Sequence, residues 1–139
     1  MRQFGTPLAG KPYTDRPGVY AVALVRGHVL VVETAVSWFL PGGGMAEGET
    51  LEATLRREVK EETGYTIAEM SFLGSARQFV SERINKVETF FRVDLEGEGP
   101  VQAEPDHRPR WVLVDDAIGG LREEAQVWAV ASARNAAQA

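Results

Sequence analysis

The strongest hydrophobic signal in the chain is a continuous apolar run from Val19 to Val25. An unbroken run of this kind is typical of a strand that is buried on both faces of a sheet. Residues 26–28 read Arg-Gly-His and can turn the chain into a second apolar run, Val29–Val32. The pattern predicts that these two runs pair as a hairpin.

Further signals follow in the second half of the chain. Residues 65–75 mix apolar and polar side chains and favour a strand. From Val87 to Leu95 apolar and polar positions alternate, which is the period of a half-buried strand. We expect next a loop over 97–109, a short strand over 111–114, a brief helical turn capped by Asp115, and a helix over 121–134.

Residues 1–17 are rich in proline and glycine and predict an extended arm with little regular structure. Residues 18–139 contain no repeat or linker and have the size of one domain. Their strands and helices are expected to form one mixed sheet with helices packed on its faces. The predicted fold class is therefore α/β or α+β.

Composition restricts the chemistry. The chain is 44% hydrophobic and 25% charged, as in ordinary globular proteins, and it has no cysteine for disulfides, thiolate catalysis or metal binding. It shows no signal peptide and no apolar run of the roughly 20 residues that span a bilayer, so we expect a cytoplasmic protein without a membrane partner. A net charge of −5 weighs against a nucleic-acid polymer as partner.

A helix is predicted from Thr50, a suitable N-cap, to Gly64, which suits the first position after a helix. At about 100° per residue, Leu51, Leu55 and Val59 fall on one stripe of its surface. This stripe is expected to face the core.

Three carboxylates occupy the last two turns of this helix, where Glu62 falls on the apolar stripe, Glu58 lies beside it and Glu61 flanks it. Like charges one turn apart repel each other, and they lie at the negative end of the helix dipole. One interpretation is a solvated face paired with Arg57 and Lys60. The other is a site for a hard divalent cation, because magnesium prefers oxygen ligands and substrate phosphates.

A glycine loop, Pro41–Gly44, precedes this helix and should break any helix or strand. By itself it reads as a tight turn, or as backbone that approaches a ligand closely. Loop and helix together resemble the Nudix box, G-x5-E-x7-R-E-U-x-E-E-x-G-U, in which U is a bulky aliphatic residue. The matching positions are Gly43, Glu49, Arg57, Glu58, Val59, Glu61, Glu62 and Gly64, and the one departure is Tyr65 at the last aliphatic position.

The resemblance to Nudix hydrolases implies an α/β/α sandwich around a central mixed β-sheet. It also implies a reaction in which water attacks a phosphorus of a nucleoside diphosphate linked to another group. Magnesium is the implied cofactor, with manganese as a substitute. The implied metal ligands are Glu58 and Glu62, then Glu61, and the carbonyl of Gly43 or Gly44.

Further roles follow from the same resemblance. Arg57 is expected to pair with Glu49 or a neighbouring carboxylate and to fix the loop, to which Gly42 also belongs. Glu58 is the first choice for the general base. Candidates outside the box are Glu104 and Asp106, with Glu82 and Glu88 behind them, whereas His28 and His107 read as turn and surface residues.

The substrate is expected to be a small nucleotide, with nucleoside triphosphates favoured. Residues 66–99 contain no proline or tyrosine, which disfavours ADP-ribose and dinucleoside polyphosphates in this family. Two alternatives stay open: a regulatory Nudix module that binds nucleotides without hydrolysis, and an RNA-end pyrophosphohydrolase. A homodimer formed through residues 1–17 is a further expectation.

Overall fold

The computed structural model describes residues 1–10, 12–80, 84–102 and 104–138. The strand order in its first sheet is β1 (Arg2–Phe4), β7 (Thr66–Phe79), β8 (Ile84–Glu96), β2 (Thr14–Val22) and β6 (Gly42–Gly44). This sheet is mixed, since β2 runs parallel to β8 and antiparallel to β6, while β7 and β8 are antiparallel. The second sheet comprises β3 (Leu24–Val25), β4 (His28–Glu33), β5 (Trp38–Phe39) and β9 (Arg108–Leu113), with β9 paired to β4.

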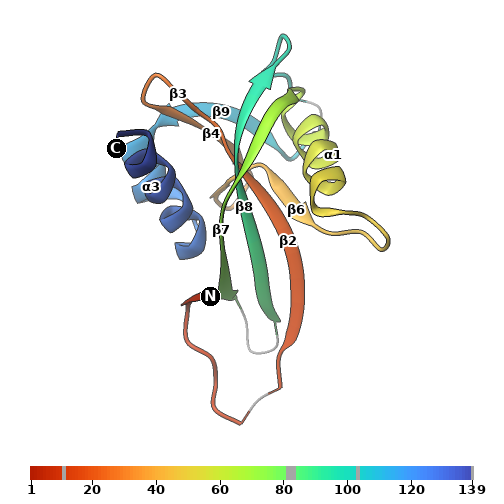
Figure 1. Cartoon of the computed structure of the whole chain (residues 1–139), viewed down its shortest axis with the longest axis vertical. Helices are drawn as coiled ribbons and strands as arrows, with labels where there is room; N and C mark the ends of the chain where they lie inside the picture. The colour runs from red at the N-terminus through yellow and green to blue at the C-terminus, as the bar shows by residue number, and fades with distance from the viewer. Residues whose placement is uncertain (11, 81–83, 103, 139) are drawn as a thin grey trace.

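Helices cover the strands from two sides (Figure 1), with α1 (Leu51–Thr63) on one side and α2 (Val114–Gly120) and α3 (Glu124–Gln138) on the other. This confirms the predicted α/β/α sandwich. No helix of the described residues is long and apolar enough to cross a membrane.

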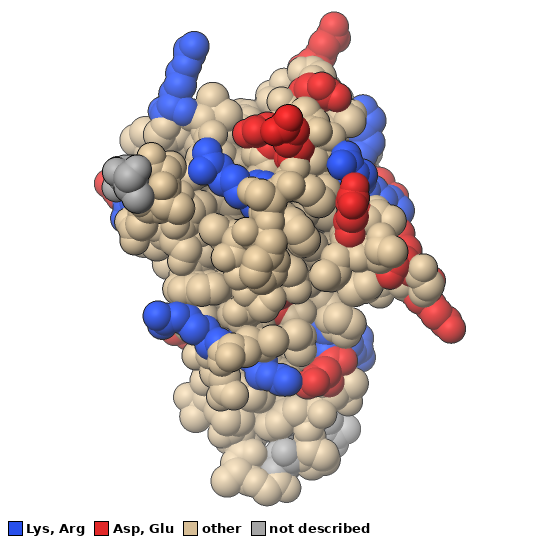
Figure 2. All heavy atoms as spheres, in the orientation of Figure 1, with Lys and Arg blue, Asp and Glu red and all other residues tan. Residues whose placement is uncertain are grey.

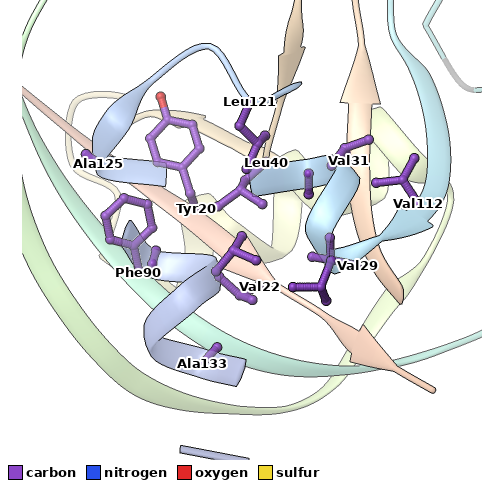
Figure 3. Packing of buried hydrophobic residues seen from close by; sticks show 14 of the residues in the cluster. Tyr20, Val22, Val29, Val31, Leu40, Phe90, Val112, Leu121, Ala125 and Ala133 are labelled. Carbon is purple, nitrogen blue, oxygen red and sulfur yellow. The ribbon is translucent and has the colours of Figure 1, made fainter. Parts of the chain in front are cut away.

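Strand β2 supplies side chains to a core on each side. Val19 and Ala21 pack with Leu55 and Val59 of α1 in one core. Tyr20 points the other way, into a second core with α2 and α3. Figure 3 shows the second core, in which Tyr20, Phe90 and Val22 lie next to Ala125 and Ala133 of α3. The continuous apolar run is explained by burial of both faces of this strand.

Helix α1 begins and ends as the sequence predicts. The hydroxyl of Thr50 accepts a hydrogen bond from the backbone N–H of Ala53 at 3.1 Å. Gly64 follows the helix with φ of 80° in the left-handed region, and its N–H donates to the carbonyl of Lys60. Backbone groups at both ends of the helix are therefore hydrogen-bonded by neighbouring residues of the same segment.

The predicted hairpin forms only at its turn. Arg26 and Gly27 both have positive φ, and β3 pairs with β4 through Leu24–Val29 and Val25–His28. The longer strand β2 instead pairs with β8 and β6 in the other sheet. The prediction was wrong here because the chain passes from one sheet to the other near Ala23.

The expected break at the glycines is also corrected, because Gly42–Gly44 form β6 and pair with β2. Gly42 has φ of 146°, and a Cβ on it would clash with the carbonyl oxygen of Val19 and lie 2.7 Å from Cα of Tyr20. Glycine is thus required at position 42 by the close approach of two strands.

Three expectations about the chain ends need correction. The N-terminal arm has regular structure, because β1 pairs with β7 and β2 already begins at Thr14. Its use in a homodimer remains a prediction. Helix α2 begins at Val114 without a side-chain cap, and Asp115 instead accepts a hydrogen bond from Arg134 at 2.8 Å. Helix α3 begins at Glu124, later than expected.

Candidate active site

Glu62 ties the last turn of α1 to the glycine strand. Its side chain is 9% exposed, and Oε1 accepts a hydrogen bond from the backbone N–H of Gly42 at 2.8 Å. Burial raises the pKa of the Glu62 carboxyl to about 8, and the hydrogen bond from Gly42 opposes this, while repulsion from Glu58, Glu104 and Glu61 adds to it. A carboxylate is thus held in a place where its charge is costly without a cation.

Glu58 lies one turn earlier, against the backbone of Gly43. A Cβ on Gly43 would stand 2.9 Å from Cδ of Glu58, so the carboxylate occupies the space that a side chain at position 43 would need. Burial raises the pKa of Glu58, whereas Arg57 lowers it and Glu61 and Glu104 raise it. Two glycines of β6 therefore position two carboxylates of α1.

Arg57 binds the carboxylate of Glu49 through two hydrogen bonds from its guanidinium group. Nε donates to Oε2 at 2.9 Å and Nη2 donates to Oε1 at 2.8 Å, so the predicted pair is present as a bidentate contact. Arg57 holds the pKa of Glu49 at about 2, and Nη1 also reaches Glu58 at 3.1 Å and Glu61 at 3.2 Å. One guanidinium thus joins three acids of the box.

The loop before β9 brings two further side chains to this place. Nε2 of His107 lies 3.7 Å from Oε2 of Glu62, and its Nδ1 lies 2.9 Å from Oε2 of Glu104. The side chain of His107 is 34% exposed, as expected near the surface, yet it lies close to Glu62, and Glu104 lies near the box as hypothesised. Asp106 is exposed, and its side chain makes no hydrogen bond or ion pair among the described residues. The one sequence feature that could have indicated a place for His107 at this site is that it lies three residues after the candidate Glu104, in the loop before β9.

Two cavities share Tyr20, whose side chain lies on the face of β2 that packs against α2 and α3. The smaller has a volume of about 180 Å³ and is lined by Gly42, Glu62 and His107. The larger, of about 390 Å³, is lined by Arg16, Gly44, Met45, Lys86 and Glu88, among others. A polyphosphate and an organic group attached to it would find adjacent spaces here.

Glu88 lies at the larger cavity and not among the box carboxylates. It is fully buried, and neither oxygen has a donor in the part of the chain that the structure describes. Burial first, and then Glu123, raise its pKa to about 10, while Lys86 opposes this and donates to Glu123 at 2.7 Å. Glu82, the other candidate, lies outside the described residues.

The donor set fits a hard divalent cation. Carboxylates and backbone carbonyls are the oxygen ligands that magnesium takes, and the crowding that raises the pKa of Glu58 and Glu62 would be relieved by positive charge. Within the described ranges no three acidic or histidine side chains converge closely enough to form a metal centre alone. A cation would thus need further oxygens, and substrate phosphates can supply them.

Comparison with known proteins identifies the class. The NUDIX domain model matches residues 14–133, and the chain belongs to the Nudix family. A solved MutT NUDIX hydrolase from Burkholderia pseudomallei shares the fold with a TM-score of 0.73 and 24% sequence identity, and the match covers 86% of this chain and 98% of that chain. A NUDIX hydrolase from Nitrosomonas europaea also shares it, with a TM-score of 0.80 and 19% identity over 88% of this chain and 90% of that chain.

Curated relatives resemble shorter parts of the chain. An 8-oxo-dGTP diphosphatase from Buchnera aphidicola is 28% identical over 57% of this chain and 58% of its own length. An RNA pyrophosphohydrolase from Coxiella burnetii is 37% identical over 59% of this chain and 36% of its own. An oxidized purine nucleoside triphosphate hydrolase from Danio rerio is 35% identical over 58% of this chain and 52% of its own length. The chain thus matches between about a third and three fifths of these relatives' lengths.

Proposed function

We propose that this protein is a metal-dependent pyrophosphohydrolase that cleaves a phosphoanhydride bond of a nucleoside triphosphate. One observation carries the proposal: Glu58 and Glu62 are held one turn apart against Gly43 and Gly42, while Arg57 clamps Glu49 beside them. Carboxylates of raised pKa at a cavity are a typical arrangement for cation and phosphate chemistry.

The proposed ligands of magnesium, or of manganese in its place, are Glu58, Glu62 and Glu61, with the carbonyl of Gly43 or Gly44. The cation would lower the pKa of a bound water and stabilise charge on the leaving phosphate. Arg57 keeps Glu58 and Glu61 oriented by hydrogen bonds to both. Glu58 is the proposed general base, and Glu104 is the second candidate because it lies beside His107.

The proposed place for a small nucleotide is the pair of cavities that share Tyr20. The phosphates would lie by Glu62, and the nucleoside would occupy the larger cavity, where Arg16 and Lys86 offer positive charge. Names of relatives support this choice, since two of them are nucleoside triphosphate hydrolases or diphosphatases. The RNA pyrophosphohydrolase relative makes a triphosphate at an RNA end the second candidate, against which the net charge of −5 weighs.

The test is a substrate panel. Canonical and oxidised nucleoside triphosphates, ADP-ribose, diadenosine polyphosphates and an RNA with a 5′-triphosphate are assayed with magnesium for released phosphate or pyrophosphate. We expect turnover of a nucleoside triphosphate, its loss in Glu58→Gln, and its loss on chelation of metal. Binding of a nucleotide without cleavage of any substrate would contradict hydrolysis and favour a regulatory module.

The choice of general base needs a separate comparison. The pH dependence of kcat is measured for Glu58→Gln and Glu104→Gln at saturating magnesium. If Glu58 is the base, Glu104→Gln keeps the acidic limb of the profile. Loss of that limb in Glu104→Gln would transfer the role to Glu104.

A further inference from the structure

A cavity of about 500 Å³ lies beside the end of α3. It is bounded by the β3–β4 turn, by β8, by the start of α2 and by the last turns of α3, and none of its lining residues lines the two cavities that share Tyr20. Arg26, Arg92 and Arg134 reach it from three different elements. This set is called the arginine cavity below.

Two of the three arginines have unpaired side-chain N–H groups when only the described residues are considered. Nε of Arg92 is buried and lacks a hydrogen-bond acceptor, and the side chain of Arg26 makes no ion pair, as judged over the residues that the structure describes. Arg134 pairs with Asp115 at 2.8 Å, but the side chain of Asp115 is 89% exposed. A buried N–H group without an acceptor lowers the stability of the fold. An acceptor atom of a ligand bound in the cavity would satisfy Nε of Arg92.

The charge at this place differs from that of the whole chain. The formal net charge of the protein is −5, whereas the lining of the arginine cavity holds three arginines and one aspartate. Figure 2 shows basic side chains at the upper left, near the β3 turn and the C-terminal end of α3, while acidic and basic ones alternate along the right edge beside α1. The cavity is thus a local centre of positive charge away from the acidic helix.

A purely structural role would have the arginines complement the negative end of α3. Over the described residues, none of the three guanidinium groups donates a hydrogen bond to a backbone carbonyl of that helix. Hydrogen-bonded capping of α3 therefore does not account for the cluster.

We infer that the arginine cavity is a second ligand site, distinct from the candidate active site, which binds a small anion with a diphosphate group. Guanidinium groups bind phosphate oxygens through pairs of parallel hydrogen bonds, and three of them around one space suit adjacent phosphates. The apolar wall provided by Leu24 and Leu113 leaves room for an organic group on the diphosphate. The inference does not depend on hydrolysis at the box.

The test uses calorimetric titration of inorganic pyrophosphate into the full chain, in buffer freed of divalent metal. Without a cation the box carboxylates repel phosphate, and the loss of binding in an arginine variant assigns the binding to the arginine cavity. We expect Arg92→Gln to weaken binding by about tenfold or more, which corresponds to about 1.4 kcal/mol. Arg122→Gln, which removes the same charge near the other end of α3, should leave the affinity unchanged.

Further arms sharpen the result. If Arg92→Gln does not fold, Arg26→Gln at the exposed turn replaces it with the same expected loss. Tighter binding of ADP than of pyrophosphate identifies a nucleotide ligand, and equal binding identifies the diphosphate itself. Absence of pyrophosphate binding at millimolar concentration, equal binding by wild type and Arg92→Gln, or citrate binding as tightly as pyrophosphate would overturn the inference. Unchanged kcat/KM in Arg92→Gln would separate this site from the catalytic one.

Discussion

The carboxylate of Glu58 occupies the space beside the backbone of Gly43 in which a side chain would otherwise lie. An added Cβ at position 43 would stand 2.9 Å from Cδ and 3.0 Å from Oε1 of Glu58. The next glycine has no such neighbour, since a Cβ on Gly44 would meet only the carbonyl oxygen of Pro17 at 3.9 Å. The absence of a side chain at position 43 thus leaves room for the Glu58 carboxylate, whereas at position 44 a side chain would have space.

This difference predicts opposite results for two small substitutions. Gly43→Ala should push the Glu58 carboxylate aside and lower kcat by about 100-fold, as misplacement by about 1 Å can do, with a loss of folding stability of about 1 kcal/mol or less. Gly44→Ala should retain activity. Steady-state kinetics and thermal unfolding of both variants check this, and equal activity of the two would show that the position of Glu58 is not critical.

A second prediction concerns the clamp between Arg57 and Glu49. Arg57→Lys keeps the charge but loses the two-armed contact, so Glu49, Glu58 and Glu61 lose a shared partner, and we expect kcat to fall by about 10- to 100-fold. The matched control is Arg56→Lys on the same helix, because Arg56 contacts the exposed Glu52 and the carbonyl oxygen of Ile67. If both lysine variants show the same kinetics, the clamp has no part in catalysis.

The sequence predicted the helical half of this site well. Capping by Thr50 and Gly64 and the stripe that buries Glu62 are local properties of one segment, and the structure agrees with them. Which strand receives a helix is a long-range property. Neither the pairing of Gly42 and Gly43 with β2 nor the arrival of His107 from the loop before β9 can be deduced from local periodicity.

Strand β8 shows the same limit. Alternation between Val87 and Leu95 placed Glu88 on a polar face, yet Glu88 is fully buried, like Phe90 on the same face. The pattern misleads because α3 covers the face that the sequence marks as polar, and Glu88 meets Glu123 there. A buried acid in a strand reads as a surface acid unless the helix above it is known.

Glu62 allows activity and stability to be separated. Its folded-state pKa of about 8 lies above the usual 4.5, so metal-free protein should lose stability as pH rises from about 4.5 to 8, where the unfolded chain has released a proton that the folded chain keeps. Glu62→Gln cannot titrate and should be more stable than wild type at pH 8 by about 1 to 3 kcal/mol, but without turnover. Denaturant unfolding in metal-free buffer and activity with magnesium test both parts.

The control is Glu61→Gln, because the side chain of Glu61 is half exposed. It should change the metal-free stability by about 0.5 kcal/mol or less. Full activity of Glu62→Gln would refute its role in metal binding.

At higher pH, the buried acid pair of Glu88 and Glu123 should have the largest effect on the free energy of unfolding. Burial and Glu123 raise the pKa of Glu88 above that of Glu62, so stability should continue to fall at pH values above 8, after Glu62 has lost its proton. Glu88→Gln removes this fall and should be more stable than wild type at pH 10 by about 1 to 3 kcal/mol. The exposed Glu69 offers a control, since Glu69→Gln should follow the wild-type curve. Parallel curves for wild type and Glu88→Gln would mean that Glu88 is already ionised at pH 8, with Lys86 as its countercharge.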